Sequence, residues 1–269
     1  MVPAPTDLRS FQSLKEIVAA LRGPQGCPWD KDQTHQSLTP FAIEEVFEFV
    51  EAIDTQNDSA IKEELGDVMF QVILHAQLAQ ERQAFTIDDV IEELNSKMVR
   101  RHPHVFGTEV AITKDDVLNQ WEVIKSKEKT RSASSVSANP FNIPTALPAL
   151  QRSYKIGLKT KKVGFDWTHV SEVKEKILEE LAEVDEAIES TAPNKIEEEL
   201  GDLLFTVAQY ARHLGFEPET CLRKSNLKFE NRYSMMLELC RQSHTDFSNL
   251  DLDTKEKLWR QAKEKLATS

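Results

Sequence analysis

EELGDVMF at residues 63–70 returns as EELGDLLF at residues 198–205, 135 positions later. The same offset separates the acidic runs that precede these stretches, EEVFE at 44–48 and EELAE at 179–183. Weaker matches follow in the same order: Asn95, Lys97 and Arg101 correspond to Asn226, Lys228 and Arg232, and Trp121 and Lys125 correspond to Trp259 and Lys263. Matches in a constant order at a nearly constant offset indicate an internal duplication, in which each copy is one structural module.

Apolar residues at helical spacing run through both copies. In the first copy they form a broad stripe along one side of a helix, made by Phe41, Ile43, Val46, Phe47, Val50 and Ile53. A polar break at 54–59 leads into a second expected helix over 60–81. Glycine is scarce, at 8 of 269 residues, and no strand-like alternation stands out. The sequence therefore predicts an all-α fold of two helical modules.

The second copy repeats this pair of helices, which we expect over 171–190 and 194–214. Pro193 cannot continue the first of them because proline lacks the backbone N–H that a helix needs. Asn194 is a suitable N-cap for the second helix, and Gly215 suits its C-terminal end. The two helices are therefore joined by a short turn, which makes them antiparallel neighbours.

The stretch between the copies reads SKEKTRSASSVSANPFNIP from residue 126 onward. It is rich in Ser, Ala and Pro and has no apolar periodicity, which is typical of a linker. We therefore expect a linker over 126–147, an N-terminal helical domain over 1–125 and a C-terminal helical domain over 148–269.

Charge, cysteines and termini exclude several classes of protein. The net charge is −12, from 33 basic and 45 acidic residues, and such a chain repels nucleic-acid polymers. Residues 1–10 lack the apolar core of a signal peptide, and the most apolar run, 68–79, is too short to cross a membrane. The 3 cysteines form no CxxC pair and there is no P-loop. We expect a cytoplasmic protein with no membrane or nucleic-acid partner.

Acidic residues recur three apart on the paired helices of both copies, so each pair shares one helix face. Antiparallel packing can bring the two pairs opposite each other as a cup of four carboxylates. Close carboxylates need a cation or protons to coexist, and oxygen ligands suit Mg²⁺ or Mn²⁺. The predicted metal ligands are Glu45, Glu48, Glu64 and Asp67 in the first copy and Glu180, Glu183, Glu199 and Asp202 in the second.

The order EExxE then ExxD resembles the all-α nucleoside triphosphate pyrophosphohydrolases. Together with GCPWDKDQT at 26–34, RRHPHVF at 100–106 and VGFDW at 163–167, the tandem arrangement is similar to that of the MazG family over nearly the whole chain. The resemblance implies hydrolysis of NTPs or dNTPs between the α and β phosphates, giving the nucleoside monophosphate and pyrophosphate with Mg²⁺ required. It also implies a base near the attacking water, for which Glu179 or Glu44 is suited.

Cationic and aromatic residues supply further candidates for binding the nucleotide. In the second copy Lys176, Lys195, Lys228 and Arg232 could clamp the triphosphate, Trp259 could stack on the base, and Lys263 lies one turn further on. We add Glu198 to this nucleotide-binding set, together with the first-copy residues Lys97, Arg101, Trp121 and Lys125. Phe41 and Ala60 stand where the second copy has Lys176 and Lys195, so we expect the C-terminal copy to dominate activity.

Two other kinds of protein share some of these features. A di-iron carboxylate bundle also uses helical glutamates, but none of the 7 histidines follows a Glu by three as that chemistry requires. A non-catalytic helical scaffold would leave the acids solvated. A two-helix hairpin cannot bury its own apolar stripe, so each module needs further helices, from this chain or from a second one. The family resemblance implies dimers that complete four-helix cores, and we expect a homodimer.

Overall fold

The computed structural model describes residues 2–108, 113, 116–117, 120–121, 124, 141–190 and 192–267. Within these residues it contains helices and no strand, which confirms the predicted fold class. The chain divides into two compact units, Met1–Ser134 and Ser135–Ser269. The division falls inside the stretch predicted as a linker, of which residues 126–140 lie outside the described part of the chain.

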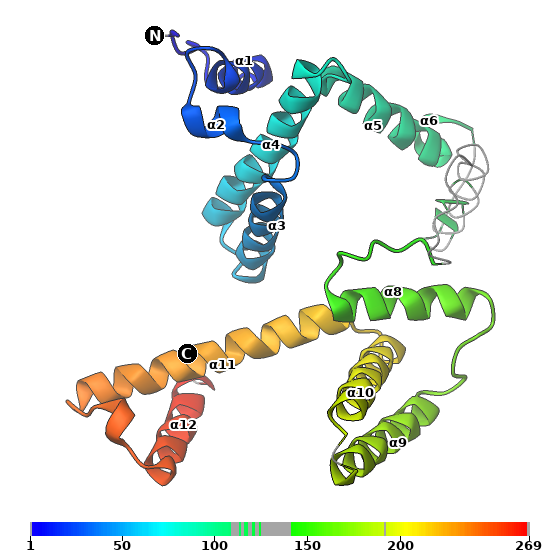
Figure 1. Ribbon diagram of the computed structural model, residues 1–269, viewed down its shortest axis with the longest axis vertical. Helices are drawn as coiled ribbons and strands as arrows, with labels where there is room; N and C mark the ends of the chain where they lie inside the picture. Colours follow the sequence, from blue (N-terminus) through cyan, green and yellow to red (C-terminus); the bar gives the residue numbers. More distant parts are fainter. Residues whose placement is uncertain are drawn as a thin grey trace. The chain divides into compact units, whose positions relative to one another are not determined.

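The first unit is organised around an antiparallel helical hairpin (Figure 1). Its helices are α1 (Phe11–Arg22), α2 (Pro28–Asp32), α3 (Thr39–Asp54), α4 (Asp58–Glu81), α5 (Ile87–Arg101) and α6 (Pro103–Phe106). The turn between α3 and α4 ends at Asn57, whose side chain accepts hydrogen bonds from the backbone of Ser59 and Ala60 and so caps α4. A small core of Val18, Leu38, Ile73 and Leu74 joins α1 to the hairpin.

The second unit repeats the hairpin, with one helix before it and two helices after it (Figure 1). Its elements are α8 (Ala149–Lys162), α9 (Val170–Glu189), α10 (Pro193–His213), α11 (Pro218–Gln242), a short 3-10 turn (Phe247–Asn249) and α12 (Leu252–Ala267). Helices α9 and α10 form the hairpin, α8 packs on α10, and α12 packs on α11.

The ends of α10 differ in one detail from the prediction. Asn194 is not the N-cap, because Ala192 takes that place and Pro193 occupies the first helical position. Proline is favoured there, since its missing N–H would have no partner in the first turn of any helix. At the other end Gly215 has the positive φ of 84° that a residue after a helix commonly adopts, as expected.

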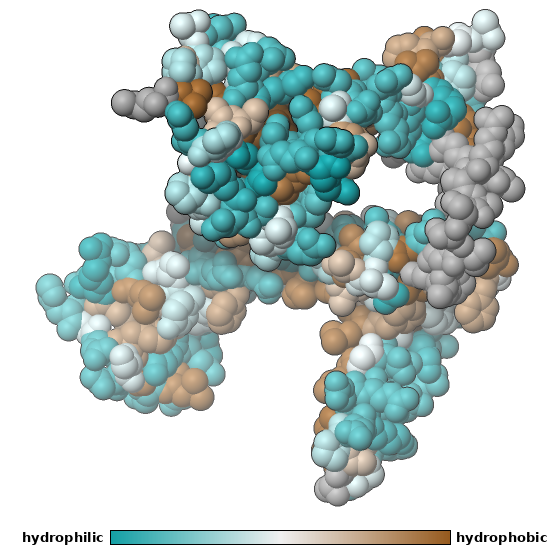
Figure 2. All heavy atoms as spheres, turned by 45° about the horizontal axis from the view of Figure 1, so that its top comes forward, coloured by the Kyte–Doolittle hydropathy of each residue, from teal (hydrophilic) through white to brown (hydrophobic). Residues whose placement is uncertain are grey.

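Both hairpins leave large apolar side chains exposed. On α9 and α10 these are Leu178, Leu181, Ile188, Leu200, Leu204 and Val207. On α3 and α4 they are Phe41, Ile43, Val46, Phe47, Ile53, Leu65, Met69 and Val72. Figure 2 shows apolar residues along one edge of the α9–α10 hairpin, beside its hydrophilic surface. No described helix is both long and apolar enough to cross a membrane.

Candidate metal and nucleotide site

Three of the four predicted acids converge in the first unit. Glu45 and Glu48 on α3 and Glu64 on α4 each bring a carboxylate oxygen within 4.8 Å of the other two. Asp67, one turn along α4, is close enough that its charge, after the effect of burial, raises the pKa of Glu45. Burial and the charges of Glu48 and Asp67 likewise raise the pKa of Glu64. The hairpin therefore collects negative charge at one place, as the spacing predicts.

The second unit builds the same cluster around a more deeply buried carboxylate. Oxygens of Glu180 on α9 and of Glu199 and Asp202 on α10 lie within 4.8 Å of one another. Glu180 is only 4% exposed. Glu183 is outside this group of three, but burial and the neighbouring charges of Glu180 and Glu199 raise its pKa. It therefore lies at the edge of the cluster.

Lys176 lies against the buried acid. Its Nζ is 2.8 Å from Glu180 Oε1 and 2.8 Å from Glu179 Oε1. Hydrogen bonds to these two carboxylates hold the pKa of Lys176 above its usual range. The lysine predicted to grip phosphate thus also neutralises part of the acid cluster in the free protein. Phe41 takes this position in the first unit, so that cluster has no equivalent cation.

The other oxygen of Glu180 supports a metal site. Glu180 Oε2 is buried and has no hydrogen-bond partner. A buried carboxylate oxygen without a partner is costly, and a cation would satisfy it. Three carboxylates and no nitrogen or sulfur donor make a set that suits a hard divalent ion. The residues present therefore fit a divalent metal.

The predicted bases of both units and the α10 members of the nucleotide-binding set are exposed on their hairpins. Glu44 and Glu179 are exposed on α3 and α9, one residue before Glu45 and Glu180. Lys195 and Glu198 are exposed on the first turns of α10, on the same helix as Glu199 and Asp202. These side chains are open to solvent.

The other residues of the second unit that we predict to bind the nucleotide lie on a different pair of helices. Lys228 and Arg232 are on α11, and Trp259 and Lys263 are on α12. The Arg232 guanidinium carbon is 5.5 Å from the centroid of the Trp259 ring, which also packs on Phe229 at 5.0 Å. The structure thus brings Arg232 and Trp259 together, on α11 and α12 rather than on the hairpin that carries the acids.

The matching first-unit residues are only partly described. Lys97 and Arg101 lie on α5, and the Trp121 ring meets His102 edge-on at a centroid distance of 5.1 Å. Lys125 lies outside the described residues. His102 Nδ1 bonds the backbone carbonyl of Met98 at 2.6 Å, which gives this histidine a structural role at the end of α5.

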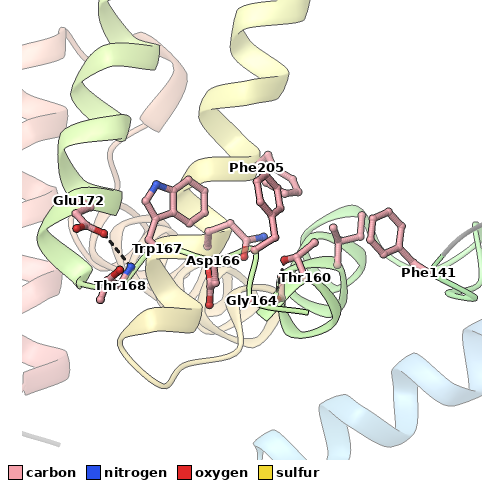
Figure 3. A pocket seen from close by; sticks show the side chains of 12 residues that line it. Phe141, Thr160, Gly164, Asp166, Trp167, Thr168, Glu172 and Phe205 are labelled. Atoms are coloured by element: carbon pink, nitrogen blue, oxygen red, sulfur yellow. Dashed lines mark hydrogen bonds between the residues drawn. The ribbon is translucent and has the colours of Figure 1, made fainter. Parts of the chain in front are cut away.

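An aromatic pocket of about 550 Å³ lies in the second unit (Figure 3). Phe141, Phe165, Trp167 and Phe205 contribute rings to its lining, and Gln209 and Glu172 contribute polar atoms. Phe205 and Gln209 follow Asp202 on α10 by three and seven residues, which places them on the same helix face as that acid. The α10 side of the pocket therefore begins one helical turn after Asp202.

Sequence reasoning missed this pocket, although its signal was present. VGFDW supplies Phe165 and Trp167, which we had used only to recognise the family. The backbone N–H groups of Thr168 and His169 donate to Glu172 Oε2, at 2.8 and 3.2 Å, and so fix the end of this loop to the start of α9. Phe141 belongs to the stretch predicted as a linker, whose last residues pack into the second unit.

Comparisons with known proteins agree with this geometry. The model of the MazG nucleotide pyrophosphohydrolase domain matches the chain twice, at residues 33–106 and 168–236. A nucleoside triphosphate pyrophosphohydrolase/pyrophosphatase MazG of Thermotoga maritima is 45% identical over 255 residues, covering 94% of this chain and 95% of the relative. A nucleoside triphosphate pyrophosphohydrolase of Escherichia coli K12 is 39% identical over 259 residues, covering 95% and 98%. This chain therefore belongs to the MazG nucleotide pyrophosphohydrolase family and carries two copies of its domain.

Proposed function

We infer that this protein is a nucleoside triphosphate pyrophosphohydrolase, which converts NTPs or dNTPs and water to the nucleoside monophosphate and pyrophosphate. The observation that carries this function is the buried, unpartnered oxygen of Glu180 within a group of three carboxylates. Relatives that match over nearly their whole length carry the same activity in their names. Since the substrates are the nucleotides of metabolism, we place the enzyme in the cytoplasm.

MazG-family hydrolases depend on divalent metal, and we propose Mg²⁺, with Mn²⁺ as a substitute. Glu180, Glu199 and Asp202 would hold the ion, with Glu183 beside them, and Glu45, Glu48, Glu64 and Asp67 would do so in the first unit. When bound, the ion supplies positive charge that offsets the phosphate oxygens and makes a bound water more acidic. The chain's own cationic side chains then have to orient the phosphates, and a carboxylate has to remove a proton from the attacking water.

Glu179 is the best placed carboxylate to accept that proton in the second unit. It is exposed next to Glu180 and shares Lys176 with it, so Glu179 has one oxygen bonded to the lysine and another free. Glu44 is its counterpart in the first unit. Lys176 would turn from these acids to the phosphates as the substrate arrives, because a triphosphate presents more negative charge than either carboxylate.

The aromatic pocket is a suitable place for the base of the nucleotide. Its rings offer flat apolar faces, and stacking of a base on an aromatic side chain contributes about 1–3 kcal/mol. We propose that the base enters this pocket while the triphosphate lies at the acids. Lys195, Glu198, Lys228, Arg232, Trp259 and Lys263 remain proposed contacts to the nucleotide, as do Lys97, Arg101, Trp121 and Lys125 in the first unit.

A product assay tests the proposed function. The full chain is incubated with each of the NTPs and dNTPs and with Mg²⁺, and the products are separated by ion exchange. We expect monophosphate and pyrophosphate in equal amounts, and none when the metal is chelated. Nucleoside diphosphate with orthophosphate, or an absence of products with every nucleotide, would contradict it. Glu186→Gln is a matched control, because Glu186 is an exposed acid on α9 outside the cluster.

We also propose that the enzyme is a homodimer. Leu178 and Leu204, on the two helices of the second hairpin, are 60% and 58% exposed. A monomeric protein rarely leaves so continuous an apolar face in water. A second copy of the same hairpin would bury it and complete a four-helix core. Light scattering at micromolar concentration is expected to give twice the chain mass of 30.7 kDa.

A further inference from the structure

A buried arginine forms an ion pair with the loop that lines one side of the aromatic pocket. Arg212, near the end of α10, is only 8% exposed. Its two terminal nitrogens donate to the two carboxylate oxygens of Asp166, with Nη1 to Oδ2 at 3.0 Å. His213 Nε2 lies 3.1 Å from the same carboxylate, and the His213 ring meets Trp167 edge-on. The loop residues Asp166 and Trp167 are therefore held from one end of α10.

The same arginine is held in turn from α8. Arg212 Nε donates to Gln209 Oε1 at 2.7 Å, and Gln209 Nε2 donates to the Ser153 carbonyl at 2.8 Å. A β-carbon added at Gly157 of α8 would lie 1.9 Å from Gln209 Oε1 and 2.5 Å from Arg212 Nε. The bare backbone of Gly157 thus leaves the space that these two side chains occupy. Buried side chains joined by several hydrogen bonds in this way rigidify their surroundings.

In the first unit the corresponding segment is the short helix α2, and the arginine that contacts it comes from α1. Arg22, at the end of α1, donates to Glu81 of α4 at 2.8 Å through both Nε and Nη2. Its Nη1 donates to the carbonyl of Asp30, the residue after Trp29. Arg22 lies eight residues before Asp30, and Gly157 lies nine residues before Asp166. At the repeat offset of 135, Gln77 stands where the second unit has Arg212.

The two units therefore carry the arginine on different helices, although in both it contacts the tryptophan-containing segment. Arg22 and Gln77 in the first unit become Gly157 and Arg212 in the second. In both, the guanidinium contacts the segment that carries a tryptophan ahead of the acidic hairpin, which is the short helix α2 with Trp29 in the first unit and the loop with Trp167 in the second. Position 157 lacks the arginine found at position 22, and position 212 has an arginine where position 77 has glutamine. Each unit therefore has one arginine at this pair of positions to hold the segment.

We propose that Arg212 is a positioning residue for the reaction: it holds the Asp166–Trp167 segment so that the aromatic pocket has the shape that takes the nucleotide base. This inference rests on the proposed function, which places the base in that pocket. Arg212 does not contact the acid cluster in any described interaction, so it acts on binding through the loop and not on the metal.

The first arm of the test needs no turnover. In a full-length chain with Trp29→Phe, Trp121→Phe and Trp259→Phe, the remaining tryptophan, Trp167, reports its own surroundings by fluorescence. Arg212→Gln, which installs the first unit's residue, is expected to shift the emission to longer wavelength and to increase quenching by acrylamide. Unchanged emission and quenching would overturn the inference, whatever the enzyme's activity.

The second arm measures turnover in the otherwise unaltered chain. We expect Arg212→Gln to raise KM for the NTP roughly tenfold or more, while kcat and the metal concentration for half-maximal rate change little. Arg212→Lys, which keeps the charge but cannot make the two-pronged contact, should give a smaller rise. An equal fall of kcat with unchanged KM, or no change at all, would also overturn the inference.

The exchange between the units provides a rescue. Adding Gly157→Arg to Arg212→Gln places an arginine and a glutamine as Arg22 and Gln77 are placed in the first unit, with Asp166 as the acidic partner because Phe216 stands where the first unit has Glu81. We expect this double variant to bring KM most of the way back to the wild-type value and to restore the original Trp167 emission. Gly157→Arg alone, which crowds Arg212, should not improve binding. Should Arg212→Gln fail to fold, Asp166→Asn removes the charge of the same contact from the loop side with little change in shape, and the same two readouts apply.

Discussion

Replacing Glu180 by glutamine should abolish activity and yet stabilise the metal-free protein. Glu180, Glu199 and Asp202 bring oxygens within 4.8 Å of one another. At that separation two unit charges repel by about 3 kcal/mol with an effective dielectric constant of about 20. Glu180→Gln removes the buried member of the group and replaces its unpartnered oxygen by an amide that can donate to a neighbouring carboxylate.

The gain is smaller than the bare repulsion, because Lys176 offsets part of the charge of Glu180 at 2.8 Å. Lys176 keeps Glu179 as a partner in the variant. We therefore expect a net stabilisation of about 1 kcal/mol, which raises Tm by roughly 2–4 °C for a domain or chain of this size. Turnover should fall by roughly two orders of magnitude or more, since a metal ligand and its charge are lost together.

Thermal unfolding in EDTA, followed by circular dichroism, gives the stability of the metal-free variant. A second scan with Mg²⁺ measures the stabilisation that the ion adds, which should shrink in Glu180→Gln and stay at the wild-type value in the control Glu186→Gln. A lower Tm for Glu180→Gln in EDTA would refute the reasoning, because it would mean that the carboxylate is held by contacts within the protein and not by an ion.

Three further outcomes are expected. Glu45→Gln should keep most of the wild-type turnover, whereas Glu180→Gln should lose it, because the first unit has Phe41 where the second has Lys176. The reverse order of activities would show that the N-terminal unit is the main catalyst. Burial raises the pKa of Asp166, but the hydrogen bonds from Arg212 and His213 outweigh it and hold that pKa below the ordinary 3.8. Its contribution to stability is therefore present above pH 3.8 and is lost as the pH falls further, so Asp166→Asn should flatten the acid limb of urea midpoints measured against pH. Leu204→Glu, which places a charge on the exposed apolar face, should halve the mass measured by light scattering, whereas the same change at an already charged exposed site should not.

The helices were predictable because each hairpin is long and strongly periodic. The expected second helix of the first copy begins only two residues late, at 60 and not at Asp58, and the expected helices of the second copy differ from α9 and α10 by one residue at each end. At the start of α10 two local preferences compete. Asparagine is a good N-cap, but Pro193, just before Asn194, is favoured at the first helical position, so the helix begins one residue earlier. The acid clusters were predictable because acids three residues apart share one face of a helix, and the pairing of two such helices brings these faces together.

The aromatic pocket could not be predicted in the same way, because its parts come from separate stretches of chain. Phe141, Trp167 and Phe205 have no common period in the sequence. Arg212, next to His213 near a helix end, has the pattern of a solvent-facing cation that offsets the helix dipole, and only the fold reveals that it is buried against Asp166. The pairing of Lys176 with Glu179 and Glu180 follows from helical spacing, yet the sequence does not say that Glu180 is the buried member.

The two units hold similar acids in different electrostatic surroundings, and this difference bears on how each would receive a triphosphate. In the first unit the pKa of both Glu45 and Glu64 is raised by burial and by neighbouring carboxylates. A bound metal ion would relieve the repulsion between the carboxylates of that cluster, but without the metal the cluster repels a triphosphate. In the second unit Lys176 already stands at the acids and can follow the phosphates. A site that must bind both a cation and an anion is better served by the second arrangement, which is the physical reason to expect catalysis mainly there.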